Sequence, residues 1–172
     1  MGSVKRGKLD IVFSLLIRER AGNVCEVTGQ TPETCQLECC HVEGRRSRST
    51  RWHPDNAFCL SHATHRHFTE NPIAWTQWVK GKIGAERYQL LYRMAHTPRK
   101  FTPRELEGLY LHYKAELVRL HTARANGRTG RIEFFWPDPI PEATPRGKAK
   151  KKPKSKFKRK ISGQTVLRED AA

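Results

Sequence analysis

The sequence has few acidic residues and no long hydrophobic run. Its 172 residues contain 33 Lys and Arg against 17 Asp and Glu, which gives a net charge of +16. No apolar stretch reaches the roughly 20 residues that a membrane-spanning helix needs, so we expect no membrane partner. The shortage of acids favours a polyanionic partner, and nucleic acid is the leading candidate.

Cysteines are also few, and their spacing does not suggest pairs. There are five, an odd number, and Cys39 and Cys40 are adjacent, which suits a disulfide framework poorly. We therefore expect a reducing, cytoplasmic location, where the cysteines are free thiols or metal ligands. Trp, Phe, Leu and Ile recur through most of the chain, which excludes a collagen-like or wholly disordered protein.

The first part of the chain predicts an α+β arrangement. An apolar stripe of Leu9, Val12, Phe13, Leu16 and Ile17 predicts a helix over 9–21, within the N-terminal segment 1–22. A small core is expected over 23–70, with strands at 24–27 and 37–42 and a helix over 57–69.

The second part predicts a helical extension over 71–125. Asn71 and Pro72 open one helix as N-cap and first residue, and residues 84–95 form another helical pattern. Residues 102–105, Thr-Pro-Arg-Glu, are a capping box that begins a third helix.

The last segment, 126–172, is expected to be extended, interrupted by prolines and then disordered. Residues 146–160 carry ten Lys and Arg and no acid. Such a tail would bind phosphates without sequence preference and with strong salt dependence, or it would serve to solubilise or localise the protein. The tail residues that we expect to contact nucleic acid are Lys150, Lys151, Lys152, Lys158, Arg159 and Lys160.

Metal-binding and phosphate-binding side chains are concentrated in the middle of the chain. The segment contains His41, His53, His62, His65 and His67, flanked by Cys39, Cys40 and Cys59. Neutral imidazole and thiolate bind transition metals, whereas arginine binds phosphate. Together they indicate metal-assisted phosphodiester chemistry. The simpler alternative is a basic surface loop with some buried histidines.

The order of these residues resembles the HNH endonucleases: a strand, His41, an Arg-rich loop, Asn56, and then His65 at the start of a helix. Cys-x-x-Thr-Gly at 25–29 resembles the turn before the first strand of that family. The stretch CHVEGRRSRSTRWHPDNAFCLSHATHRHFTENPIAWTQWV, followed by GAERYQLL, is similar to the phage NinG (Rap) recombination nuclease group. The resemblance covers roughly residues 9–120.

The resemblance implies a small ββα-metal core braced by several helices, with a disordered basic C-terminal tail. It also implies a metal-dependent endonuclease that hydrolyses DNA phosphodiester bonds, with nicked, duplex or branched recombination DNA as substrate. A phage-encoded protein would act in the cytoplasm of a bacterial host.

Residue roles follow from the resemblance. His41 would take a proton from the attacking water, and Asn56 would orient its loop or bind metal, or serve only as a turn residue. His65 would be a metal ligand, and Cys40 stands where the family usually has an Asp or His ligand. A thiolate is a poor ligand for a hard ion such as Mg²⁺. The identity of the divalent cation is therefore left open among Mg²⁺, Mn²⁺, Ni²⁺ and Zn²⁺.

Two further residues are candidate metal ligands. Glu38 lies two residues before Cys40, so its side chain would point to the same face of a strand. His62 lies three residues before His65 on the same helix face, as a second ligand or a surface histidine.

Four arginines between His41 and Asn56 are candidates for contacts to the DNA backbone: Arg45, Arg46, Arg48 and Arg51. No acid lies among residues 44–54, so these cations would repel one another without an anion. The alternative is a solvated charged loop.

Two other functions remain open. A DNA-binding protein on an inactive HNH scaffold would explain Cys40, and a structural zinc adaptor would recruit a partner through the Pro-rich segment 134–145. Structural zinc is not expected, however, because Cys25 is followed by Thr28 rather than by a second cysteine. A homodimer is also left open. The helix predicted at 102–124 carries the one clear apolar stripe that could form a dimer interface.

Overall fold

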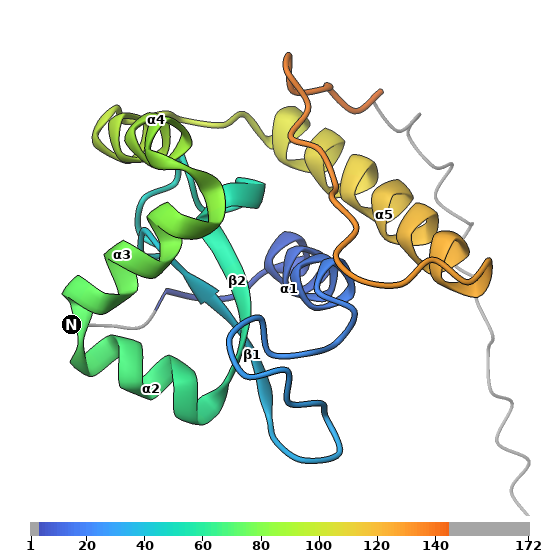
Figure 1. Cartoon of the computed structure of the whole chain (residues 1–172). Helices are drawn as coiled ribbons and strands as arrows, with labels where there is room; N and C mark the ends of the chain where they lie inside the picture. Colours follow the sequence, from blue (N-terminus) through green and yellow to red (C-terminus); the bar gives the residue numbers. More distant parts are fainter. Residues whose placement is uncertain (1–3, 145–172) are drawn as a thin grey trace, which may run out of the picture.

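The computed structural model describes residues 4–144 of the chain. Within that range, five α-helices surround a two-stranded antiparallel sheet, so the fold class is α+β (Figure 1). In chain order the elements are α1 (Lys8–Arg20), β1 (Leu37–His41), the 3-10 turn η1 (Pro54–Asn56), β2 (Ala57–Ser61), α2 (His62–Glu70), α3 (Pro72–Ile83), α4 (Ala85–His96) and α5 (Pro103–Ala125).

The sheet forms the centre of the molecule and continues directly into a helix. In the β1–β2 register, Leu37 lies opposite Ser61 and His41 opposite Ala57. Ser61 ends β2 and also caps α2, because its side chain accepts a hydrogen bond from the Thr64 N–H at 3.3 Å. The chain therefore runs β1, loop, β2 and α2 in immediate succession.

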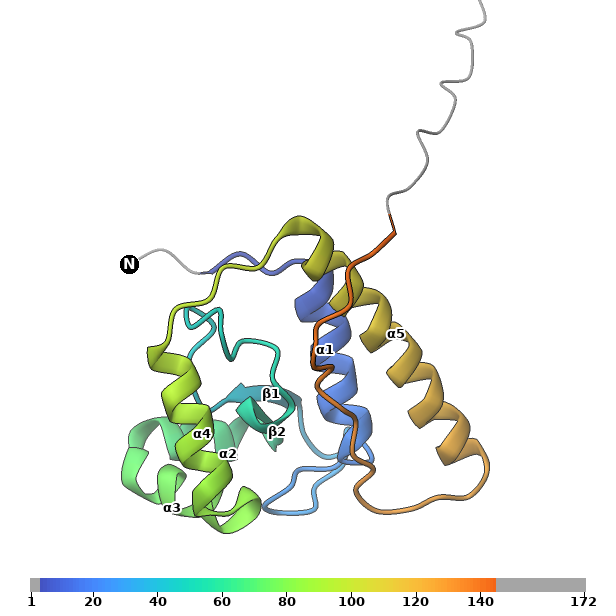
Figure 2. The same ribbon diagram turned by 90° about the horizontal axis from the view of Figure 1, so that it is seen from above.

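Helices cover both faces of this hairpin. In both views α1 and α5 lie together on one side, and α2, α3 and α4 lie on the other (Figures 1 and 2). Two hydrophobic clusters correspond to these two sides. Each large apolar side chain that becomes fully buried in them contributes roughly 1.5–3 kcal/mol.

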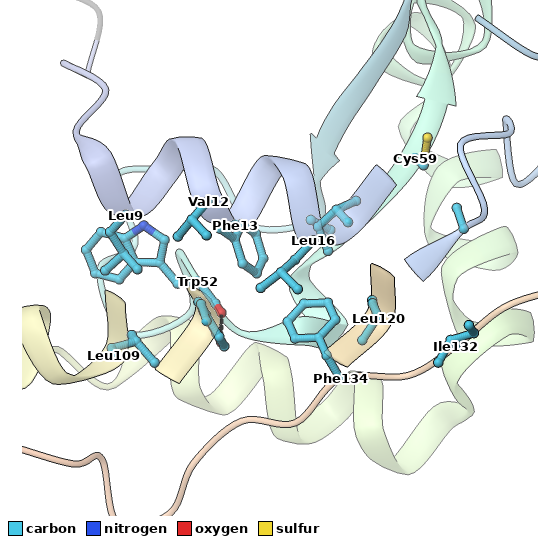
Figure 3. Packing of buried hydrophobic residues seen from close by; sticks show 14 of the residues in the cluster. Leu9, Val12, Phe13, Leu16, Trp52, Cys59, Leu109, Leu120, Ile132 and Phe134 are labelled. Carbon is cyan, nitrogen blue, oxygen red and sulfur yellow. Dashed lines mark hydrogen bonds between the residues drawn. The ribbon is translucent and has the colours of Figure 1, made fainter. Parts of the chain in front are cut away.

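The larger cluster joins α1, α5 and the irregular segment after α5. Its α1 members are the five residues of the predicted apolar stripe, Leu9, Val12, Phe13, Leu16 and Ile17, all of them buried. Phe13 and Leu16 point toward Leu120 of α5 and toward Phe134 (Figure 3). Residues 131–144 contain no helix or strand, as their prolines predict, yet Ile132 and Phe134 are buried.

The three helices predicted within residues 71–125 are present as α3, α4 and α5. The capping box that opens α5 is present, since Thr102 Oγ1 accepts from the Glu105 N–H at 3.1 Å and Glu105 Oε2 accepts from the Thr102 N–H at 2.7 Å. No helix within residues 4–144 is long and apolar enough to cross a membrane. The Lys-rich segment 146–160 lies outside the described residues.

One predicted element is wrong, and the helix predicted over 57–69 is present only from residue 62 onward. Residues 24–27 are a turn rather than a strand, because the Gly29 N–H closes onto the Cys25 carbonyl at 2.8 Å and Gly29 adopts a φ of 72°. Residues 57–61 are a strand rather than the start of a helix. All five are buried on both faces of the hairpin, so they lack the alternation that would have marked them as a strand.

Candidate active site

A cavity of about 470 Å³ lies between α1 and β1. One wall comes from a single face of α1, where Asp10, Phe13, Ser14 and Arg18 follow one another at helical spacing. The other wall consists of β1 residues and residues that adjoin β1 in space: Gln36, Leu37, Glu38, Cys39, His41, Gly44, Arg45 and His65. Arg6 completes the lining from just before α1. The cavity therefore holds imidazole, carboxylate and guanidinium groups together.

Glu38 and His65 form the centre of the predicted metal site. Glu38 Oε2 lies 2.6 Å from His65 Nδ1, and Oε1 lies 3.0 Å from His62 Nδ1. Burial opposes ionisation of Glu38, but the hydrogen bonds to both imidazoles lower the pKa of its carboxyl below the ordinary value. The expected grouping of these residues is thus present, although the His62 side chain is largely exposed.

Cys40 completes a cluster of three donors. One ligand atom each from Glu38, Cys40 and His65 lies within 4.8 Å of the others, as expected from Glu38 and Cys40 sharing a strand face. Burial, with Cys39 and Glu38 nearby, raises the pKa of the Cys40 thiol well above its usual range. A divalent cation at this position would have to displace the thiol proton. The donor set suits Zn²⁺ or Ni²⁺ and suits Mg²⁺ poorly.

His41 ends β1 and has a fixed ring orientation. Its Nε2 lies 3.2 Å from the Arg51 carbonyl oxygen, and its ring packs 5.9 Å from the Phe13 ring. Because a carbonyl only accepts hydrogen bonds, Nε2 carries the proton and Nδ1 keeps a free lone pair. Burial is the main cause that lowers the pKa of His41 to about 4, and Arg45 adds to it. His41 is therefore neutral at neutral pH and keeps a lone pair, but its pKa lies below the value near the working pH that best suits a general base.

Asn56 ties together the two ends of the loop that follows His41. Its Oδ1 accepts from the Glu43 N–H at 2.7 Å, and its Nδ2 donates to the Glu43 carbonyl at 3.0 Å. The Val42 N–H also donates to the Asn56 carbonyl at 2.8 Å. Asn56 is fully buried, and both polar atoms of its side chain are occupied. These hydrogen bonds fit the expected role of Asn56 in orienting the loop. They do not fit the alternative role as a metal ligand.

The four loop arginines have different surroundings. Arg45 lines the cavity, whereas Arg46 and Arg48 are exposed. Arg51 is not positioned to contact the DNA backbone, as was expected of it. It is buried, and its Nε and Nη2 donate to both Asp10 carboxylate oxygens at 2.7 and 2.8 Å. Charge composition gave no indication of this pair, because Asp10 lies 41 residues away in the sequence.

The predicted DNA contacts in the tail, Lys150, Lys151, Lys152, Lys158, Arg159 and Lys160, lie outside the described residues.

Two cavity arginines were missed by the sequence analysis. Arg6 precedes α1, and Arg18 lies on the face of α1 next to the apolar stripe, with Phe13 shared by the two faces. The available clue was the spacing of Ser14 and Arg18, which are four residues apart and therefore share a face. In the structure, Arg18 Nη1 donates to Ser14 Oγ at 3.0 Å.

The surroundings of Cys25 do not fit a structural zinc ion. Cys25 Sγ lies 3.8 Å from Thr64 Oγ1, which in turn lies 2.9 Å from Ser61 Oγ. Burial opposes ionisation, but hydrogen bonds from Thr28 and the Ser61 backbone lower the pKa of the Cys25 thiol to about 7. Hydroxyl groups are poor zinc ligands, and here they serve as hydrogen-bond partners that join the 25–29 turn to α2.

Comparisons of the chain with family models, with curated proteins and with solved structures give no match.

Proposed function

We propose that the protein is an HNH-type, metal-dependent endonuclease that hydrolyses DNA phosphodiester bonds. One observation carries the proposal: a single cavity contains a neutral, oriented His41, the Glu38–His65 pair and the guanidinium groups of Arg6, Arg18 and Arg45. A proton acceptor, a site for a divalent cation and phosphate-binding cations are the components that phosphodiester hydrolysis requires.

Each component has a role in the proposed reaction. His41 Nδ1 takes the proton from the attacking water, while the Arg51 carbonyl holds the ring and Asn56 holds the loop. Glu38 and His65, with Cys40, would hold the divalent cation. When bound, that cation polarises the scissile phosphate and stabilises the leaving oxygen.

The order of the elements also supports the HNH proposal. His41 ends β1, Asn56 ends the loop before β2, and His65 lies in the first turn of α2. This is the order that the sequence resemblance implies for a ββα-metal core.

A second candidate function is DNA binding without catalysis. The buried, protonated Cys40 favours it, because a neutral thiol in the ligand set weakens the hold on a cation. Such a protein would bind DNA through the same arginines and would leave phosphodiester bonds intact.

A cleavage assay distinguishes these functions. Supercoiled plasmid and a four-way junction are incubated with Mg²⁺, Mn²⁺, Ni²⁺ or Zn²⁺ and with the wild type, His41→Ala or Lys82→Ala. We expect metal-dependent cutting that falls about 10²- to 10⁴-fold in His41→Ala. Lys82→Ala, which removes an exposed cation from α3, should cut like the wild type. Salt-sensitive DNA binding with no cutting by any metal would support the non-catalytic alternative.

A further inference from the structure

The cavity follows the free edge of a β-strand. Its lining includes Leu37, Cys39 and His41, which point to one face of β1, and also Glu38, which points to the other. Residues of both faces can line one cavity only along the edge of a strand. β2 pairs with the other edge of β1. The cavity is therefore a groove between the unpaired edge of β1 and one face of α1, and we call it the α1–β1 groove.

The groove has three cations that lack carboxylate partners. Within residues 4–144, Arg6, Arg18 and Arg45 form no ion pair, although most arginines of this part of the chain do. Of the two acids in the lining, Asp10 is neutralised by Arg51, and Glu38 is bonded to His62 and His65. Unpaired guanidinium groups around one cavity favour an anionic ligand, and phosphate suits their geometry.

The cations are spread along the groove instead of being gathered at one point. Arg18 lies near the end of α1 and Arg6 lies just before its start. The ten residue-to-residue steps from Lys8 to Arg18 along the helix rise about 15 Å. His41, Glu38 and His65 belong to the facing wall. An extended nucleic-acid strand in the groove would therefore place the reacting phosphate near the facing wall. Its neighbouring phosphates on either side would then meet Arg6 and Arg18.

The size of the groove favours an unpaired strand. The cavity volume of about 470 Å³ falls in the range of sites that hold small molecules. A site of this size cannot enclose a DNA duplex. The one aromatic side chain in the lining besides the imidazoles is Phe13, which is only 1% exposed. Phe13 is thus not available for base stacking, which leaves the phosphate backbone as the recognised feature.

We infer that the α1–β1 groove binds one unpaired DNA strand through its phosphates, with Arg18 and Arg6 as positioning residues on either side of the scissile phosphate. The inference rests on the proposed function for the identity of the nucleic acid. It adds that the substrate is single-stranded at the site, as at a branch, flap or melted end, and that binding does not depend on sequence.

Binding of a short fluorescent oligonucleotide tests the inference without cleavage. Fluorescence anisotropy is measured over a series of salt concentrations in the His41→Ala background. The proteins compared are that background alone and with Arg18→Ala, Arg18→Lys, Arg6→Ala or Lys82→Ala. Single-stranded DNA, single-stranded RNA and a blunt duplex are the ligands. Circular dichroism melting of each variant confirms that it is folded.

We expect Arg18→Ala and Arg6→Ala each to weaken single-strand binding and to reduce the slope of log affinity against log salt by about 0.7, the value for one lost phosphate contact. Arg18→Lys should keep the slope, since it keeps the charge. Lys82→Ala should change nothing, and single-stranded DNA should bind more tightly than the duplex. Single-stranded RNA should bind about as tightly as single-stranded DNA, because the inferred contacts are to phosphates and not to the 2′-hydroxyl.

Unchanged affinity and slope in Arg18→Ala, or duplex that binds as tightly as the single strand, would also overturn the inference. Failure of the proposed function has a different signature, which is no cleavage by the wild type with any metal while these binding differences persist.

Discussion

At the scale of single residues, the two imidazoles of the cavity have been given different properties by their partners. His65 bonds to a carboxylate, which favours ligation of a cation through that pair. His41 bonds to a backbone carbonyl and is shielded from solvent, which keeps its ring neutral and makes it a weaker base than an exposed imidazole. The same side-chain type is therefore a candidate ligand in one place and a candidate proton acceptor of low basicity in the other.

The low pKa of His41 predicts a loss of stability in mild acid. Folding lowers this pKa from 6.5 to about 4, so between these pH values the unfolded chain binds a proton that the folded chain does not. This contribution is zero above pH 6.5, where both states are neutral, and it lowers the free energy of unfolding progressively as the pH falls from 6.5 toward 4. A shift of this size corresponds to roughly 3 kcal/mol.

Urea unfolding at neutral pH and near pH 4 measures this contribution. Between neutral pH and pH 4, the free energy of unfolding of the wild type should fall by about 2 kcal/mol or more beyond its fall in His41→Gln, whose side chain does not titrate. Equal losses in the two proteins would show that His41 is not held neutral by the fold.

At the scale of elements, Gly108 allows the irregular segment after α5 to lie against that helix. A Cβ at this position would come within 1.7 Å of the Pro141 carbonyl oxygen. Gly108→Ala should therefore lower the free energy of unfolding by roughly 1–3 kcal/mol, although Ala is the better helix former.

Gly81 in α3 is the matched control, because a Cβ there meets nothing within 4 Å. Gly81→Ala should raise stability by roughly 0.5–1 kcal/mol, and thermal melting of both variants gives the comparison. A stabilising Gly108→Ala would mean that the 131–144 segment does not pack on α5.

The elements that the sequence predicts well are those whose signals are local. The apolar stripe of α1 and the Thr102–Glu105 capping box depend on residues within one or two helical turns, and both were found. β2 was missed because its burial on both faces depends on α1 and α3, which are distant in the sequence. Without alternation, a short buried strand cannot be distinguished from a helix by periodicity.

The candidate site shows the same division. Glu38, Cys40 and His65 were expected together because two of them share a strand and the third follows a motif, and the structure does bring them together. Arg51 was assigned to DNA because its partner Asp10 could be identified only from tertiary structure. Arg18 was overlooked for the same reason, since the cavity exists only where α1 packs beside β1.

At the scale of the whole molecule, an excess of positive charge includes three arginines that line the groove without an ion pair in the described part of the chain. The chain carries a net charge of +16, and many of its arginines within residues 4–144 are committed to ion pairs. The unpaired ones in the cavity lie beside the candidate reacting groups. A net positive charge steers DNA toward the protein, and the cations in the groove would then place a phosphate next to His41.

The rate of plasmid cleavage as a function of metal concentration is the measurement that tests the central claim most directly. If Glu38 and His65 hold the cation while His41 moves the proton, two variants should fail in different ways. His65→Ala should raise the metal concentration needed for half-maximal cleavage about tenfold or more. His41→Ala should lower the maximal rate about 10²- to 10⁴-fold with that concentration unchanged. Wild-type protein that does not cut at any metal concentration, or His41→Ala that cuts at the wild-type rate, would contradict the proposed active site.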